Sequence, residues 1–141
     1  MTAAEKPRRV VAITGAGGAL GAAVSRQLAG EPATDLVLSD VSEPSLEATV
    51  AGLGDATGTV ETALADVGDV DQVLSVVDLA VERFGRLDVL ISNAGVRSPS
   101  GRIHNLTTED WERAFRINVL GAVNGIRAAV PVPPSTASTI I

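Results

Sequence analysis

Residues 14–21 read Thr14-Gly15-Ala16-Gly17-Gly18-Ala19-Leu20-Gly21, and this glycine-rich stretch determines how the chain around it folds. A short apolar run from Val10 to Thr14 precedes it, and Leu20, Val24 and Leu28 follow at the four-residue spacing of one helix face. A strand, a tight turn and a helix in this order direct backbone N–H groups at the helix N-terminus toward a bound anion. The stretch therefore predicts a site for the pyrophosphate of a dinucleotide, formed by Thr14, Gly15, Gly17, Gly18, Ala19, Leu20 and Gly21.

Beyond this turn, short β-branched runs alternate with longer amphipathic segments. We expect further strands at residues 36–39, 60–64 and 87–91, and helices that begin at Ser42, Asp69 and Thr107. Such alternation is typical of repeated βαβ units, so the predicted fold class is α/β, a Rossmann-type doubly wound parallel sheet. Residues 139–141 look like the start of a fifth strand. We expect a single NAD(P)-binding domain over residues 1–141, truncated after the fourth strand and the long helix that follows it.

The composition excludes several classes of function. A net charge of −6 leaves no basic surface of the kind that binds nucleic acid or an anionic membrane. The chain has no cysteine and one histidine, so we expect no metal site, and the lack of thiols agrees with a reducing cytoplasm. No apolar run approaches the ~18 residues of a membrane span. We expect a cytoplasmic protein whose partner is a small molecule, with no nucleic acid and no membrane.

Asp40 lies at the end of the second expected strand, about 20 residues beyond the glycine turn. A carboxylate at this place can accept hydrogen bonds from both hydroxyls of an adenosine ribose, and it would repel a 2′-phosphate. No arginine or lysine lies inside the glycine turn or just after Asp40 to reverse that preference. The sequence therefore favours NAD over NADP, and the alternative interpretation of Asp40 is a solvated carboxylate at a strand end.

Two short segments follow the later strands. Asp66-Val67 comes after the third expected strand, and Asn93-Ala94-Gly95 comes after the fourth. Because open parallel sheets bind ligands at the carboxyl ends of their strands, we expect both segments to face the cofactor. The structural alternative is that Asp66 starts a turn and that Gly95 ends a strand with a positive φ angle.

In the order in which they occur, these segments resemble the short-chain dehydrogenase/reductase family. The resemblance rests on the glycine turn, Asp40, Asp66-Val67, residues 85–95 and residues 111–121, and it covers nearly the whole chain. It implies an enzyme that transfers a hydride between the nicotinamide of NAD and a small alcohol or carbonyl substrate. In such enzymes a tyrosine transfers the proton, helped by a serine and a lysine.

The resemblance also implies roles for individual residues. Asp66 and Val67 would hold the adenine, and Asn93 to Gly95 would line the nicotinamide side. Asn118 would be the asparagine of the catalytic tetrad. The helix at residues 108–130 would form the interface of a homo-oligomer.

Two features depart from the family's pattern. The spacing Gly15, Gly18, Gly21, with Ala19 between, is that of the branch containing sugar epimerases and dehydratases. If Ala19 had to adopt a left-handed conformation, the strain would be ~1–2 kcal/mol. The chain also has no tyrosine, and its only lysine is Lys6, so we expect the 141-residue chain alone to be inactive. The alternatives are a non-catalytic NAD-binding module or truncated remnant, and an epimerase- or dehydratase-like relative with tightly held NAD.

Asn118 can also be interpreted from its place on the helix. It shares a face with Trp111, Phe115, Ala122 and Gly125, and we expect this face to be buried, with Trp111 and Phe115 in the core. A buried asparagine needs a polar partner. The alternative to the catalytic-family role is therefore a core asparagine that is hydrogen-bonded to backbone.

Overall fold

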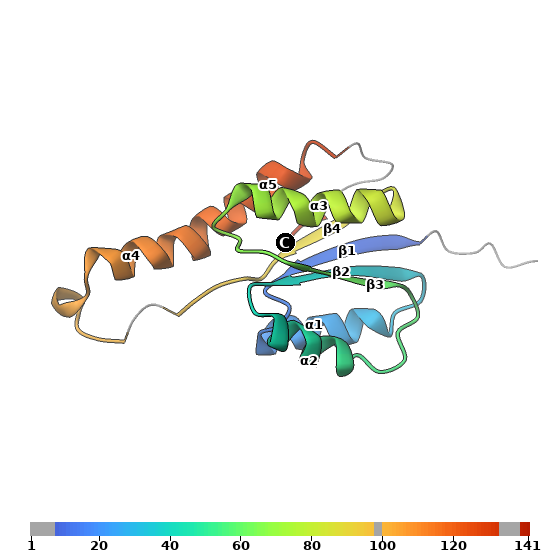
Figure 1. Ribbon diagram of the computed structural model, residues 1–141, viewed down its shortest axis with the longest axis horizontal. Coiled ribbons are helices and arrows are strands. Elements are labelled where there is room, and N and C mark those ends of the chain that lie inside the picture. Colours follow the sequence, from blue (N-terminus) through green and yellow to red (C-terminus); the bar gives the residue numbers. More distant parts are fainter. Residues whose placement is uncertain (1–7, 98–99, 133–138) are drawn as a thin grey trace, which may run out of the picture.

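The computed structural model describes residues 8–97, 100–132 and 139–141, and a parallel sheet forms its centre (Figure 1). Within these residues the sheet has five strands in the order β3-β2-β1-β4-β5. Their bounds are β1 Arg9–Thr14, β2 Thr34–Asp40, β3 Val60–Leu64, β4 Val89–Ser92 and β5 Thr139–Ile140. The chain builds from β1 toward β3 and then changes direction toward β4, which makes the β1–β4 boundary a switch point where such sheets bind ligands. The predicted doubly wound parallel fold is confirmed.

Strand β5 extends the sheet beyond β4. Val89 pairs with Thr139 and Leu90 with Ile140, and the N–H of Ser92 donates to the carbonyl of Ile141 at 2.7 Å. The expected beginning of a fifth strand is therefore present. As a result β4 lies between β1 and β5. It is not the open edge strand that it would be in a sheet of four strands.

Helices cover both faces of the sheet, with α1 and α2 on one side and α3 and α5 on the other (Figure 1). Their bounds are α1 Ala19–Ala29, α2 Glu43–Ala51, α3 Val70–Phe84, α4 Thr108–Phe115 and α5 Gly121–Ala129. The predicted caps are present, since Ser42, Asp69 and Thr107 each accept a hydrogen bond from a backbone N–H of the next turn. None of the helices in the described ranges is both long and apolar enough to cross a membrane.

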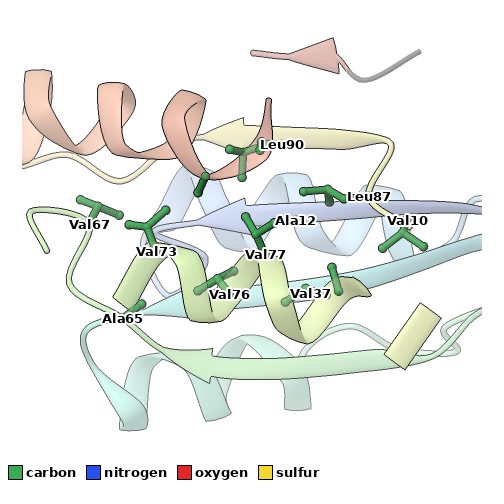
Figure 2. Close-up of a cluster of buried hydrophobic side chains, with 13 residues drawn as sticks. Val10, Ala12, Val37, Ala65, Val67, Val73, Val76, Val77, Leu87 and Leu90 are labelled. Carbon is green, nitrogen blue, oxygen red and sulfur yellow. The ribbon is translucent and has the colours of Figure 1, made fainter. Parts of the chain in front are cut away.

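The core consists of two clusters, one on each face of the sheet. Successive side chains of a strand point to opposite faces, so Val10 and Ala12 of β1 enter one cluster while Val11 and Ile13 enter the other. Figure 2 shows the first cluster, in which the valines of α3 pack over β1, β2 and β4. These two layers of helices fix the strands, and with them the loops at their carboxyl ends.

The long helix expected at residues 107–130 consists of three segments. Between α4 and α5 lies a π-helical segment, η2, at Arg116–Leu120. Segment α4 projects past the carboxyl ends of the strands (Figure 1), where no sheet lies beneath it. Trp111 and Phe115 are consequently 45% and 56% exposed, and the prediction that they belong to the core is wrong.

Candidate functional site

A cavity of about 630 Å³ lies at the carboxyl ends of the strands. It brings together the glycine turn, the end of β2 and the loops that follow β3 and β4. Every residue predicted to bind the cofactor, except Thr14, lines it: Gly15, Gly17, Gly18, Ala19, Leu20, Gly21, Asp40, Asp66, Val67, Asn93, Ala94 and Gly95. Four sequence segments that lie far apart along the chain therefore form one concave surface.

The glycine turn is shaped by neighbouring parts of the chain itself. Gly15 has a φ of +67°, and a Cβ there would lie 2.6 Å from the Cα of Ala94. A Cβ on Gly17 would lie 2.7 Å from the Cβ of Ser45 and 3.0 Å from the carboxyl carbon of Asp40. These glycines thus allow the turn to approach the loop after β4 and the start of α2. Ala19 has no positive φ, so the strain considered for a left-handed alanine does not arise.

Helix α1 begins without a side-chain cap. Its N-cap residue is Gly18, and its first turn carries no acidic residue. By contrast, Ser42 caps α2, Asp69 caps α3 and Thr107 caps α4. The first N–H groups of a helix have no partner within the helix. At α1 these groups therefore face the cavity in a position to bind an anion.

Asp40 is held in a fixed orientation at the cavity wall. Its Oδ2 accepts a hydrogen bond from the N–H of Gly17 at 2.9 Å, and its Oδ1 accepts one from the N–H of Ser42 at 3.0 Å. Each carboxylate oxygen can accept a second hydrogen bond. Asp40 therefore joins the glycine turn to the start of α2 and still offers acceptor positions to a ligand.

Thr14 lies behind the cavity and not on its surface. It is 3% exposed, and its Oγ1 accepts a hydrogen bond from the N–H of Ala94 at 3.2 Å. Asn93 completes this junction, because its Nδ2 donates to the carbonyls of Thr14 at 3.1 Å and Gly15 at 3.0 Å. The role of Thr14 in the structure is to attach the loop after β4 to the glycine turn.

Asn118 also lies outside the cavity lining, at an exposed position in η2. Its Oδ1 accepts a hydrogen bond from the N–H of Val96 at 2.8 Å, and its Nδ2 donates to the carbonyl of Val96 at 2.8 Å. The expected burial of this residue is wrong, but the expected partner in the backbone is present. Val96 lines the cavity, so Asn118 holds one wall of the site from behind.

Several lining residues are not part of the predicted set. They are Val41, Ser45, Ala65, Val96, Arg113, Arg116 and Ile117. Three of them, Arg113, Arg116 and Ile117, have the spacing of one helix face, which is the signal in the sequence that could have identified them. That signal shows which residues lie together, but not which loop they contact.

Arg116 forms an ion pair with Asp66 across the cavity wall. Its Nη1 donates to Oδ2 of Asp66 at 2.9 Å, while the N–H of Gly68 donates to Oδ1 at 2.8 Å. The hydrogen bond from Arg116, and to a smaller extent that from Gly68, holds the pKa of the Asp66 carboxyl below its ordinary value. Asp66 therefore remains a carboxylate through the neutral pH range.

Comparison with known sequences places the chain in a family. Residues 9–141 match the family described as short chain dehydrogenase. The chain is 36% identical over 124 residues to the CLA biosynthesis dehydrogenase/reductase of Lactiplantibacillus plantarum, covering 88% of this chain and 43% of that protein. It is 36% identical over 139 residues to the levodione reductase of Leifsonia aquatica, covering 94% of this chain and 52% of that protein. The chain thus spans about half the length of these relatives.

Solved structures agree with this assignment. A crystal structure of levodione reductase superposes with a TM-score of 0.87 at 33% identity, over 96% of this chain and 54% of that chain. A short-chain dehydrogenase/reductase from Burkholderia phymatum in complex with NAD superposes with a TM-score of 0.87 at 34% identity, over 98% of this chain and 49% of that one. Sequence, fold and the arrangement of the cavity agree, and the chain belongs to the short-chain dehydrogenase/reductase family.

Proposed function

We propose that this chain is an NAD-binding domain, and that it supplies the cofactor site of an oxidoreductase acting on a small alcohol or carbonyl compound. The observation that carries the proposal is that the glycine turn, Asp40 and the loops after β3 and β4 line one cavity of about 630 Å³. This volume lies within the roughly 300–1,000 Å³ of small-molecule sites. Membership of the family and a solved neighbour with bound NAD support the same function.

The residues of the cavity fit the parts of NAD from one end to the other. The uncapped N–H groups of α1 would bind the pyrophosphate, and Asp40 would accept hydrogen bonds from the adenosine ribose. Asp66 and Val67 would hold the adenine, and Asn93 to Gly95 would line the nicotinamide side. NAD supplies the hydride acceptor for an alcohol, and its reduced form supplies the donor for a carbonyl.

Asn118 acts in this proposal as a positioning residue. Its carboxamide forms both of its hydrogen bonds with the backbone of Val96, which lines the cavity beside the predicted nicotinamide-side residues. The family role implied for Asn118 would therefore be exerted through the loop after β4, by keeping that loop at a fixed distance from the cofactor.

The preference for NAD over NADP rests on Asp40. Its carboxylate is oriented by Gly17 and Ser42 so that its remaining acceptor positions lie at the cavity wall. A 2′-phosphate placed near this group would meet a negative charge, and like charges in contact are strongly unfavourable. We therefore propose NAD as the cofactor.

Catalysis by the 141-residue chain alone is not expected. The sequence contains no tyrosine, and its only lysine, Lys6, lies outside the described residues. Removing a positioned general acid lowers the rate typically ~10² to 10⁴-fold. The lack of tyrosine favours a second candidate function, a non-catalytic NAD-binding module in which the cofactor stabilises the fold.

The helix at residues 108–130 would also carry an interface between copies of the chain. Its exposed apolar side chains follow a spacing of three or four residues, which places them along one face of the helix. We call this face the apolar stripe; it consists of Trp111, Phe115, Val119, Val123, Ile126 and Val130, each more than 40% exposed. Contiguous exposed apolar surface of this kind marks interaction sites.

Isothermal titration of the 141-residue chain with NAD, NADP and AMP tests the proposal directly. Binding of NAD with a higher affinity than NADP, together with a melting temperature that rises as NAD is added, is the expected result. A chain that is folded by circular dichroism but binds none of the three ligands would exclude both candidate functions. An assay with alcohols and NAD then distinguishes the enzyme from the binding module.

A further inference from the structure

The helix that carries Asn118 is attached firmly to the loop after β3. Arg116 Nη1 donates to Asp66 Oδ2 at 2.9 Å, and Asn124 Nδ2 donates to the carbonyl of Val67 at 2.9 Å. The backbone of the helix also comes close, because a Cβ on Gly121 would lie 2.7 Å from Cγ2 of Val67. The residues predicted to hold the adenine thus contact the helix at three successive points.

The guanidinium of Arg116 fits this loop closely. A Cβ added at Gly68 would collide with the guanidinium group, so the loop passes directly under the side chain. The carboxylate of Asp66 is then held from two sides, by Arg116 on Oδ2 and by the N–H of Gly68 on Oδ1. The backbone N–H of Asp66 donates to Oε1 of Gln72 at 2.8 Å, which fixes the start of the loop to α3.

Two residues of the π-helical segment η2 contact two different loops. Residues two apart on a helix point in different directions, so Arg116 and Asn118 do not share a face. Arg116 contacts the loop after β3, and Asn118 contacts Val96 in the loop after β4. These loops follow β3 and β4, which are separated in the sheet by β2 and β1, and both loops line the cavity. Segments of π-helix occur frequently at functional sites.

We propose that Arg116 is a positioning residue for the adenine end of the cofactor, acting by orienting the carboxylate of Asp66; this rests on the proposed function. Each oxygen of that carboxylate has one hydrogen bond in the structure and can accept another from the amino group of an adenine. Without Arg116 the carboxylate would keep only the hydrogen bond from the N–H of Gly68 to Oδ1, and Oδ2 would lose its fixed position. The same stretch of helix would thereby hold both ends of NAD, through Arg116 at the adenine and Asn118 at the nicotinamide.

A merely structural ion pair would behave differently in experiments. The side chains of Arg116 and Asp66 are 43% and 32% exposed, and ion pairs with such exposure contribute little to stability. Loss of Arg116 should therefore leave the melting temperature nearly unchanged while it weakens ligand binding. This separation of affinity from stability is the signature of a positioning role.

The test compares Arg116→Gln with Arg113→Gln in the full 141-residue chain. Arg113 lines the same cavity one turn earlier, and the structure shows no hydrogen bond or ion pair of its guanidinium with the residues it describes. Both substitutions remove one positive charge from the cavity, but only the first breaks the ion pair. We expect Arg116→Gln to raise the Kd of AMP about tenfold and the Kd of NAD by the same factor, and Arg113→Gln to change neither by that much. Arg116→Lys should lie between, because a lysine keeps the charge without the planar fork.

Every other result of this comparison contradicts one particular step of the proposal. Equal effects of Arg113→Gln and Arg116→Gln on AMP would show a general charge effect, and an unchanged Kd for AMP in Arg116→Gln would show that Asp66 is oriented without it. If Arg116→Gln does not fold, the variant Arg116→Lys provides the test. The positioning role is overturned if Arg116→Lys is also unfolded, or if it folds and binds AMP as tightly as the unaltered chain does. If the unaltered chain binds neither NAD nor AMP, the proposed function itself fails, which is distinguishable from a chain that binds both but is insensitive to Arg116.

Discussion

Asn118 and Val96 are joined by two hydrogen bonds of 2.8 Å that run in opposite directions between one carboxamide and one backbone residue. Only a side chain with both a donor and an acceptor can form this pair, and among residues of this size that is asparagine. The identity of residue 118 is thus determined by the loop after β4, which forms the wall of the cavity.

The substitution Asn118→Asp tests this relationship. An aspartate can accept from the N–H of Val96, but it cannot donate to the carbonyl, and its charge would repel that oxygen. We expect a loss of about 1 kcal/mol in the free energy of unfolding and weaker binding of NAD. Urea unfolding and calorimetric titration measure both quantities. Asn105→Asp, at an exposed position of the short helix η1 Ile103–Asn105, is the matched control and should change neither; equal losses in both variants would refute the interpretation.

Asp40 should determine the choice of cofactor. Asp40→Ala removes the negative charge that would face the ribose in the proposed complex, and also the two hydrogen bonds from the N–H groups of Gly17 and Ser42. The ratio of NADP to NAD dissociation constants should fall about tenfold, because the repulsion of a 2′-phosphate is lost. Asp55→Ala removes the same charge from an exposed loop and is the control. An unchanged ratio in Asp40→Ala would mean that another group selects the cofactor.

Gly17 should tolerate no side chain. In Gly17→Ala the new Cβ would lie 2.7 Å from the Cβ of Ser45 and 3.0 Å from Asp40, so the turn or α2 has to move. Overpacking of this kind lowers the free energy of unfolding by about 1–3 kcal/mol, and the displaced turn should bind NAD more weakly. Gly30→Ala is a suitable control because its Cβ would be 3.6 Å from the nearest atom. The comparison uses thermal unfolding with and without NAD; similar behaviour of the two variants would contradict the predicted contact.

Acid should destabilise the fold mainly through Asp35, whose side chain is 8% exposed, whereas the more exposed ion pair of Asp66 should contribute little. The hydrogen bond from Arg8 at 2.8 Å, opposed in part by desolvation, holds the pKa of Asp35 below its ordinary value, and Arg116 does the same for Asp66. A carboxyl with a lowered folded-state pKa stabilises the fold fully above its unfolded pKa of about 3.9, and this stabilisation is lost as the pH falls toward the folded value. The free energy of unfolding should therefore decrease below about pH 4.

The variant Asp35→Asn shows how much of this acid-induced loss of stability is due to Asp35. This variant should be less stable at pH 7 and show a smaller decrease on acidification, because the asparagine does not titrate. Asp55→Asn removes the same charge from an exposed loop and should show the same dependence of unfolding free energy on pH as the unaltered chain. Urea unfolding between pH 7 and pH 3 measures these slopes. If the free energy of unfolding depends on pH in the same way in Asp35→Asn and in the unaltered chain, Asp35 does not cause the acid-induced loss of stability.

Much of the fold could be predicted from the sequence because its signals are local. The caps at Ser42, Asp69 and Thr107 depend on residues three positions apart or fewer. The strand expected at residues 60–64 has the same bounds in the structure, because a short stretch with β-branched residues between turn residues indicates a strand without reference to its neighbours. Most residues of the cavity lining could also be predicted, because they directly follow expected strands and the carboxyl ends of parallel strands meet at one edge of the sheet.

Other features depend on contacts between distant residues. Arg116 and Asp66 are 50 positions apart, and nothing in the local sequence of either indicates the other. The π-helical segment also differs from the expectation, because apolar periodicity alone predicts one unbroken helix over these residues. For Trp111 and Phe115, the spacing correctly indicates a shared face, but it does not show whether anything covers that face.

The apolar stripe should be the contact between two copies of the chain. Phe115 lies in its N-terminal half and is 56% exposed, so Phe115→Glu would place a charge in the proposed interface without disturbing the core. Sedimentation should show a self-associated unaltered chain and a monomeric Phe115→Glu variant, because a buried unpaired charge opposes association. Ile103→Glu adds the same charge at a side chain that is 73% exposed and lies outside the stripe, and it should leave the association unchanged. A monomeric unaltered chain would show that the stripe does not join two copies, and loss of association in both variants would point to net charge as the cause.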